Sequence, residues 1–181
     1  MNPEIRIVCR FPTDDDLTEE RVQGLSALIN AVYDDAESGM WKRKGIRTTP
    51  DEVKRLLKEK RLILAEIGGV VVGSVNVNLL SGRIGELGML VSDVKHRGKG
   101  VGSALVKAAE QWAKRIDCET MQLELLTPRR WKHPSKEFLK RWYRKIGYEP
   151  QIAESFEKLS PDKFAELATD CDFMVWHKRL V

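Results

Sequence analysis

The stretch that decides the fold is Leu87–Ile116, which reads LGMLVSDVKHRGKGVGSALVKAAEQWAKRI. Its first residues alternate between two faces, with the period of two that a β-strand requires. Its second half carries apolar residues at the three- and four-residue steps of an amphipathic helix. These are Val101, Leu105, Ala108, Trp112 and Ile116. The stretch therefore predicts a strand that runs into a helix through a short polar turn.

The turn itself, His96–Ser103, contains three glycines. Glycine lets the backbone turn tightly and bring several N–H groups close to one object. These N–H groups also lie at the start of a helix, where roughly half a positive charge is concentrated. Such a turn is typical of a phosphate or pyrophosphate site. It is no Walker A loop, since no Gly-x-x-x-x-Gly-Lys-Ser/Thr occurs, and Ser103 stands where a dinucleotide-binding fingerprint has its third glycine.

Within the turn, Arg97-x-x-Gly100-x-Gly102 resembles the Gln/Arg-x-x-Gly-x-Gly/Ala signature of the GNAT superfamily of acetyl-CoA-dependent N-acetyltransferases. The resemblance extends from about Leu62 to Tyr148. One departure is Val94, where many relatives carry proline. No chemistry depends on that position, so the resemblance holds.

The resemblance implies an α/β fold, the GNAT fold, with a central mixed sheet and helices on both faces. Strands that cluster first and then alternate with helices indicate the same mixed sheet. Two parallel strands are expected to splay apart after Glu86, and the pantetheine arm of acetyl-CoA to enter the gap. Residues 1–181 are expected to form a single domain of this kind.

The composition narrows the class of protein. A net charge of +4 over 181 residues suits a polyanionic ligand and does not demand nucleic acid. Three scattered cysteines, Cys9, Cys118 and Cys171, have no metal spacing and indicate reduced thiols in a cytoplasmic setting. No run approaches eighteen apolar residues, so no membrane is expected as a partner. No metal is expected, and a homodimer is left open.

Acetyl transfer to an amine requires a proton acceptor, stabilisation of the carbonyl oxygen and a proton donor for the leaving thiolate. Glu86 is the candidate base, because apolar neighbours would raise its pKa by desolvation. It lies eleven residues before Arg97, the offset at which the histone-modifying branch of the family has its catalytic glutamate. The alternatives are a glutamate paired with an arginine, or one that binds the substrate's ammonium group.

Tyr143 is the candidate acid. Tyr143-x-x-x-Gly147-Tyr148 resembles the Tyr-x-x-x-Gly-Phe end of the GNAT helix that faces the cofactor's sulfur. A phenol with a pKa near 10 can protonate a thiolate of comparable basicity. The alternative is a core tyrosine, because apolar residues are expected to share its helix face. These are Phe138, Leu139, Trp142 and Ile146.

The resemblance assigns cofactor binding to backbone groups of the strand, to the turn and to the start of the tyrosine helix. The residues are Leu90, Ser92, Arg97, Gly98, Lys99, Gly100, Val101, Gly102, Ser103 and Ser135. Relatives usually carry asparagine where Ser135 and Lys136 stand. The basic run 129–145 is predicted to be a solvated face, with the cofactor's 3′-phosphate and nucleic acid as alternatives.

The acceptor is expected between two loops, one carrying Met40, Trp41 and Arg43 and the other formed by Glu154–Asp170. The sequence thus indicates an N-acetyltransferase that moves acetyl from acetyl-CoA to a primary amine by direct attack, since no cysteine lies in the motif region. A small amine or amino acid is the favoured acceptor. The alternatives are a protein lysine or N-terminus, or a non-catalytic CoA-binding regulatory module.

Overall fold

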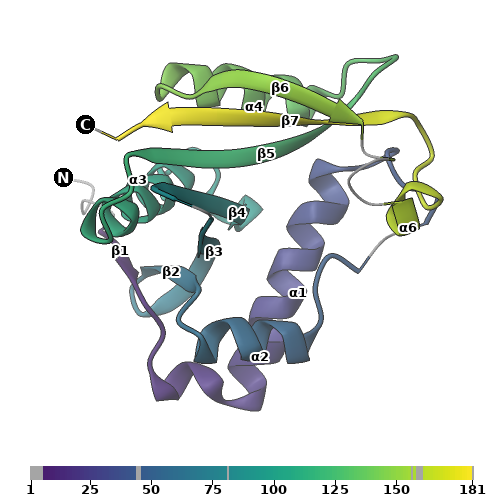
Figure 1. Ribbon diagram of the computed structural model, residues 1–181. Coiled ribbons are helices and arrows are strands. Elements are labelled where there is room, and N and C mark those ends of the chain that lie inside the picture. Colours follow the sequence, from purple (N-terminus) through teal and green to yellow (C-terminus); the bar gives the residue numbers. More distant parts are fainter. Residues whose placement is uncertain (1–5, 44–45, 81, 156, 158–160, 181) are drawn as a thin grey trace.

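The computed structural model describes residues 6–43, 46–80, 82–155, 157 and 161–180. Helices and strands follow the expected order (Figure 1). The elements are β1 Ile7–Arg10, the 3-10 helix η1 Asp14–Leu17, α1 Glu19–Ala36, α2 Pro50–Lys58, β2 Leu62–Ile67, β3 Val70–Leu79, β4 Ile84–Ser92, the 3-10 helix η2 Val94–His96, α3 Val101–Arg115, β5 Thr120–Pro128, α4 Pro134–Lys145, β6 Glu149–Ser155, α6 Pro161–Phe164 and β7 Cys171–Arg179. None of the described helices is long and apolar enough to cross a membrane.

The strands form one mixed sheet in the order β1-β2-β3-β4-β5-β7-β6. The pair β4–β5 is parallel and the other described pairs are antiparallel. Helices α1 and α2 pack on one face, and α3 and α4 pack on the other (Figure 1). This arrangement confirms the mixed sheet with helices on both faces.

The parallel strands β4 and β5 part after three residue pairs. Their pairing ends at Glu86, which faces Gln122, and no later residue of β4 pairs with β5 in the described chain. The cause lies on the other side of β4, where Met89 and Leu90 together face the single residue Val75 of β3. Such a bulge bends the strand that carries it. The expected splay after Glu86 is therefore present.

Met89 is the residue that makes the bulge unusual. Its φ is 45°, in the left-handed region that non-glycine residues rarely adopt. Its side chain is buried among residues of α1, α2 and β2. Burial of a long apolar side chain contributes about 1.5–3 kcal/mol, which is enough to hold a strained backbone of this kind.

Helix α3 lies close against the sheet because two glycines make room for it. A Cβ on Gly73 would lie 3.0 Å from Val101 Cγ1, and one on Gly85 would lie 3.0 Å from Ala113 Cβ. The expected buried face of α3 is confirmed in part. Val101 and Leu105 are buried, and Ala108 and Trp112 pack partly buried against the core. Ile116, which follows the last residue of the helix, is 40% exposed.

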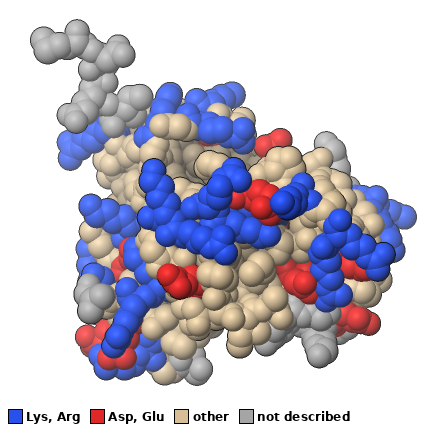
Figure 2. Space-filling view, turned by 90° about the horizontal axis from the view of Figure 1, so that it is seen from above, with Lys and Arg blue, Asp and Glu red and all other residues tan. Residues whose placement is uncertain are grey.

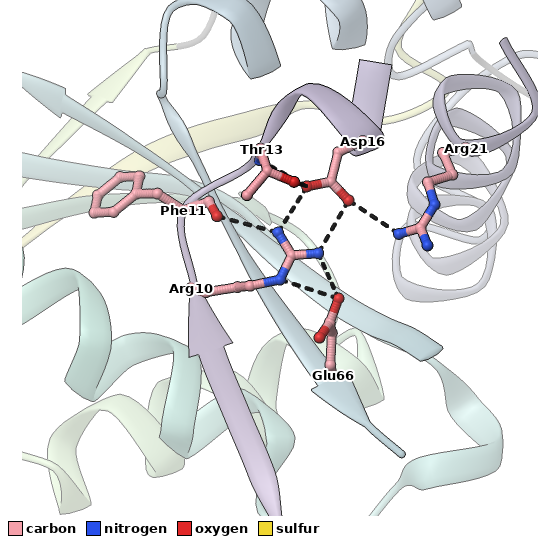
Figure 3. A network of polar contacts seen from close by, with 6 residues as sticks. All are labelled: Arg10, Phe11, Thr13, Asp16, Arg21 and Glu66. Carbon is pink, nitrogen blue, oxygen red and sulfur yellow. Dashed lines mark hydrogen bonds and ion pairs between the residues drawn. The ribbon is translucent and has the colours of Figure 1, made fainter. Parts of the chain in front are cut away.

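A buried ion-pair network fixes the start of the chain to the sheet (Figure 3). Asp16 is 2% exposed and accepts two bonds from the guanidinium of Arg10, at 2.6 and 3.0 Å. Arg10 also donates to Glu66 of β2, and Arg21 of α1 donates to Asp16 at 3.1 Å. Hydrogen bonding to Arg10 holds the pKa of Asp16 well below its usual range. The network joins β1, η1, α1 and β2.

Candidate active site

A cavity of about 380 Å³ opens where β4 and β5 have separated. Its two lips are Leu87–Leu90 of β4 and Leu123–Leu126 of β5. The rest of its wall comes from the end of α1, the loop between α1 and α2, the inner face of α4, and the segment around α6. The remaining lining residues are Val32, Tyr33, Asp34, Ala36, Glu37, Ser38, Gly39, Trp41, Arg43, Ile46, Arg47, Lys136, Leu139, Tyr143, Lys163, Glu166 and Phe173.

The glycine turn has the geometry of an anion site. Gly98 and Gly100 adopt φ values of 79° and 87°, and Gly100 is the N-cap of α3. No side chain caps the helix and no acidic residue stands in its first turn. Among the described residues, the N–H groups of Val101, Gly102 and Ser103 have no acceptor. Free amides at a helix N-terminus with exposed glycines before them fit a pyrophosphate.

The other predicted cofactor residues lie along the path between this turn and the cavity. Leu90 lines the cavity, whereas Ser92 lies two residues further along β4, at its end. Arg97 is exposed and pairs with Asp35 of α1 at 3.3 Å. Ser135 is half-buried at the start of α4, where its N–H donates to Nδ1 of His133, the N-cap residue. Ser135 is not among the residues that line the cavity.

Glu86 stands where the two strands part. It faces Asn78 of β3 on one side and Gln122 of β5 on the other. Burial raises the pKa of Glu86, while a hydrogen bond to Asn78 and the charge of Arg61 oppose that rise. Glu86 does not itself line the cavity, which begins at Leu87. A proton would reach Glu86 from the cavity through a bridging water.

Tyr143 lines the cavity from α4 and also belongs to the core. Its ring meets Tyr148 edge to face, with centroids 5.9 Å apart, and it is 5% exposed. Burial raises the pKa of Tyr143 well above its ordinary value of 10. Its hydroxyl has no hydrogen-bond partner in the described part of the chain. Buried tyrosine hydroxyls normally have a partner, so this one is open to a ligand atom.

Two expectations about α4 are wrong. Phe138 is 58% exposed and does not share the buried face of Tyr143. Lys136 was expected on a solvated basic face, yet it is 4% exposed and lines the cavity. The rest of that face does carry exposed basic residues, including Arg141 and Arg144. Figure 2 shows Lys and Arg gathered across the side of the molecule that carries α4 and β6.

The residues predicted to meet the acceptor separate into two groups. Trp41 and Arg43 line the cavity, and Arg43 is exposed. Met40 is fully buried, does not line the cavity, and packs with Leu126, which does. Met40 therefore supports the wall from behind.

The loop between α1 and α2 is tied down over the cavity from two sides. On one side, His133 Nε2 lies 3.0 Å from the carbonyl oxygen of Ser38. On the other side, the N–H of Lys42 donates to the carbonyl of Glu166 at 2.9 Å, and Trp41 pairs with Leu167 as a β-bridge. The segment after α6 and the N-cap residue of α4 thus hold Ser38–Lys42 of this loop in place beside the cavity.

Sequence reasoning missed several charged or polar side chains in the cavity. Tyr33 lines the cavity with the guanidinium of Arg47 above its ring, 4.9 Å from the centroid. Glu37 and Lys136 form an ion pair of 2.8 Å in the same wall. No local pattern distinguishes these residues from solvated ones, because their partners come from distant elements.

Comparisons with known proteins agree with this geometry. No curated protein sequence matches the chain. The chain is similar to the PaiA N-acetyltransferase from Thermoplasma acidophilum in complex with coenzyme A, with 13% identity, a TM-score of 0.71, and coverage of 97% of this chain and 99% of that one. It is similar to the IAA acetyltransferase from Bacillus cereus, with 16% identity, a TM-score of 0.62, and coverage of 97% and 100%.

A third structure is longer than this chain. The N-acetylglutamate synthase from Neisseria gonorrhoeae, complexed with coenzyme A and N-acetyl-glutamate, shares 14% identity at a TM-score of 0.65. The alignment covers 99% of this chain and 36% of the synthase, so the chain spans about a third of that protein. At these identities the likeness shows the fold. Because the sequence model of the acetyltransferase (GNAT) family matches residues 26–148, more than half of the chain, this protein belongs to that family of acetyltransferases.

Proposed function

We propose that this acetyltransferase moves acetyl from acetyl-CoA to the primary amine of a small molecule, such as an amino acid, by direct attack. The observation that carries the proposal is the cavity between β4 and β5, which is lined by Leu87–Leu90 of β4, by Tyr143 and by side chains of both charges. When bound, acetyl-CoA supplies an activated thioester. The pyrophosphate would rest on the N–H groups of Val101, Gly102 and Ser103, which have no other acceptor among the described residues.

Glu86 is proposed to take the proton of the acceptor amine through a water. A lysine-like amine has a pKa near 10.4, so presenting it neutral at pH 7 costs about 4–5 kcal/mol. The raised pKa of Glu86 makes its carboxylate a stronger base than a solvated glutamate. A glutamate that only binds the ammonium group would affect mainly the acceptor KM, whereas a base would affect kcat, and this separates the two roles.

Tyr143 is proposed to give its proton to the departing sulfur. Its hydroxyl has no partner among the described residues, and its raised pKa keeps it protonated across the physiological range. An apolar site raises the pKa of a thiol as well as that of a phenol. The phenol of Tyr143 can therefore still protonate a thiolate that is held beside it in the same site.

The enclosed wall supports a small acceptor over a protein chain. The loop that carries Trp41 is bonded both to the segment after α6 and to α4, so an extended peptide would have to break these contacts. Both signs of charge line the cavity, including Arg43, Arg47 and Glu166. A cavity of this kind suits an amine that also carries a carboxylate. One structural neighbour, the N-acetylglutamate synthase, holds N-acetyl-glutamate, the acetylated form of an amine of that class.

The experiment is a thiol-release assay of the purified protein with acetyl-CoA against a panel of amines, amino acids, lysine peptides and N-terminal peptides. We expect turnover with small amines or amino acids and none with the peptides. Turnover with the peptides alone would show that the acceptor is a protein lysine or N-terminus and not a small molecule. Binding of coenzyme A without any turnover would favour the regulatory module.

A calorimetric titration with coenzyme A tests the donor site separately. Gly100→Asp puts a side chain and a negative charge at the left-handed N-cap of α3, so we expect heat of binding to be lost. Gly24→Asp is the matched control, because a Cβ at Gly24 meets nothing within 4 Å. Binding retained by Gly100→Asp would refute the pyrophosphate site.

A further inference from the structure

Glu37 joins three walls of the cavity through one carboxylate. It is the C-cap residue of α1. Its Oε2 accepts a bond of 2.7 Å from the indole Nε1 of Trp41, and its Oε1 accepts one of 2.8 Å from Nζ of Lys136. All three residues line the cavity. One side chain thus connects α1, the loop after it, and α4.

The place of Glu37 is unfavourable for the helix that carries it. A carboxylate at a helix C-terminus lies at the negative end of the helix dipole, where it costs about 0.3–1 kcal/mol. Its side chain is 11% exposed, so it also loses hydration. Helix stability therefore does not explain a glutamate here, and its bonds to Trp41 and Lys136 do.

Lys136, in turn, depends on Glu37 for its ion pair. Its side chain is 5% exposed, and a buried ammonium group is stable only when it is paired. Glu37 is its ion-pair partner in the described chain. Lys136 lies seven residues before Tyr143 on α4, which is two helical turns, and Leu139 lies between them on the same cavity wall. Fixing Lys136 therefore fixes the helix that presents Tyr143.

We infer that Glu37 is a positioning residue that sets the acceptor wall of the active site. It holds the indole of Trp41 and the ammonium group of Lys136 in place before the acceptor arrives. The role rests on the proposed function, because it concerns how the amine is seated. Pre-formed walls lower the ordering cost of binding, so loss of Glu37 affects acceptor binding more than the chemical step.

The test compares three single variants, one double variant and the charge-conserving Glu37→Asp with one control. Glu37→Gln removes the charge opposite Lys136, Lys136→Met removes the buried ammonium group, and Trp41→Phe removes the indole N–H but keeps an aromatic ring. The control is Glu20→Gln, an exposed carboxylate at the other end of α1. Each protein is assayed with the best amine of the panel for kcat and acceptor KM, and titrated with coenzyme A.

We expect Glu37→Gln and Trp41→Phe to raise the acceptor KM about tenfold, with kcat and coenzyme A affinity within about threefold of wild type. The double variant Glu37→Gln/Trp41→Phe should raise the acceptor KM by less than the product of the two single effects, because both changes act on the contacts of the same side chain. Glu37→Asp, which keeps the charge, should recover part of the acceptor KM.

Two outcomes would overturn the inference. An unchanged acceptor KM in Glu37→Gln would show that Glu37 positions nothing. A fall of kcat and of coenzyme A affinity as large as the rise of the acceptor KM, together with a lower melting temperature, would show a merely structural ion pair. These are distinct from failure of the proposed function, in which the wild-type protein itself acetylates no amine, and the inference falls with it.

Discussion

Gly85 and Gly88 lie three residues apart on β4, on either side of the point where the sheet opens. A Cβ on Gly85 would lie 3.0 Å from Ala113 Cβ and 3.2 Å from Met121 Sδ. A Cβ on Gly88 would meet nothing within 4 Å, because Gly88 lines the cavity. Glycine thus allows close packing before Glu86, in the closed part of β4. After Glu86, in the open part, it leaves the strand backbone without a side chain facing the cavity.

This difference between the two parts of β4 predicts that substitutions before and after Glu86 have different effects. Before Glu86, β4 is paired on both edges and covered by α3, so changes there act on stability. After Glu86, the strand has lost its β5 partner and its lip faces the cavity, so changes there act on binding and catalysis. Three experiments test this division.

The largest effect is expected away from the cavity, at Asp16 of η1, whose partner Arg10 belongs to β1. Asp16→Asn removes the negative charge from a pair in which Asp16 is buried and the side chain of Arg10 is 27% exposed, so we expect a cost of about 3 kcal/mol, the lower end of the range for buried pairs. The free energy of unfolding at pH 7, measured with urea, should fall by roughly this amount. Kinetic constants of the folded variant should stay near those of wild type.

The pH dependence of this effect follows from the lowered pKa of Asp16. Its contribution is fully present above the pKa of an unfolded aspartate, about 3.9, and is lost as the pH falls through the lower folded value. The difference between wild type and Asp16→Asn should therefore shrink in acid. Asp15→Asn, an exposed neighbour, is the control, and an equal loss there would contradict the prediction.

The second-largest effect is expected at Glu86, where β4 and β5 part. Glu86→Gln should lower kcat by about 100-fold, most strongly below pH 8, since above that pH the amine increasingly loses its own proton. Coenzyme A affinity should be nearly unchanged. Because burial raises the pKa of Glu86, its carboxylate is disfavoured in the folded state, and the neutral amide should not lower stability at pH 7. A pH–rate profile identical to that of wild type would remove Glu86 from the mechanism.

The smallest effect contrasts the two glycines directly. Gly85→Ala forces a methyl group against Ala113 and Met121, and overpacking of this kind costs about 1–3 kcal/mol. The melting temperature should fall by about 2–10 °C, measured by calorimetry, with kinetic constants little changed.

Gly88→Ala is the matched variant in the open part. Its methyl group has room, so stability should hold, while the added volume in the cavity changes KM for the acceptor or the donor by several-fold. If Gly88→Ala destabilised the protein as much as Gly85→Ala, the division between the closed and open parts of β4 would be wrong.

Much of this fold could be predicted because its signals are local. The alternation in β4, the glycine turn and the helical periodicity of α3 each specify a backbone conformation within one segment. These elements were predicted correctly, as was most of the buried face of α3. The close approach of α3 to the sheet was not predicted, because it depends on Gly73 and Gly85, which lie outside that segment.

The candidate site could be predicted only in part. Glu86, Tyr143 and the turn carry a family pattern, and their chemical roles stay predictions. Glu37 and Lys136 carry none, since a glutamate and a lysine nearly a hundred residues apart look like ordinary surface charges. Their burial as a pair is visible only in three dimensions.

The sequence by itself determined the strand, the glycine turn and the helix of Leu87–Ile116, because these depend on glycine geometry and on periodicity within one segment. The tertiary structure decided where the sheet opens and what lines the opening. The bulge that places Met89 at a φ of 45° is stabilised by side chains of α1, α2 and β2, and the cavity wall is assembled from elements far apart in the chain. Contacts between distant segments, which no local pattern encodes, therefore shape the site.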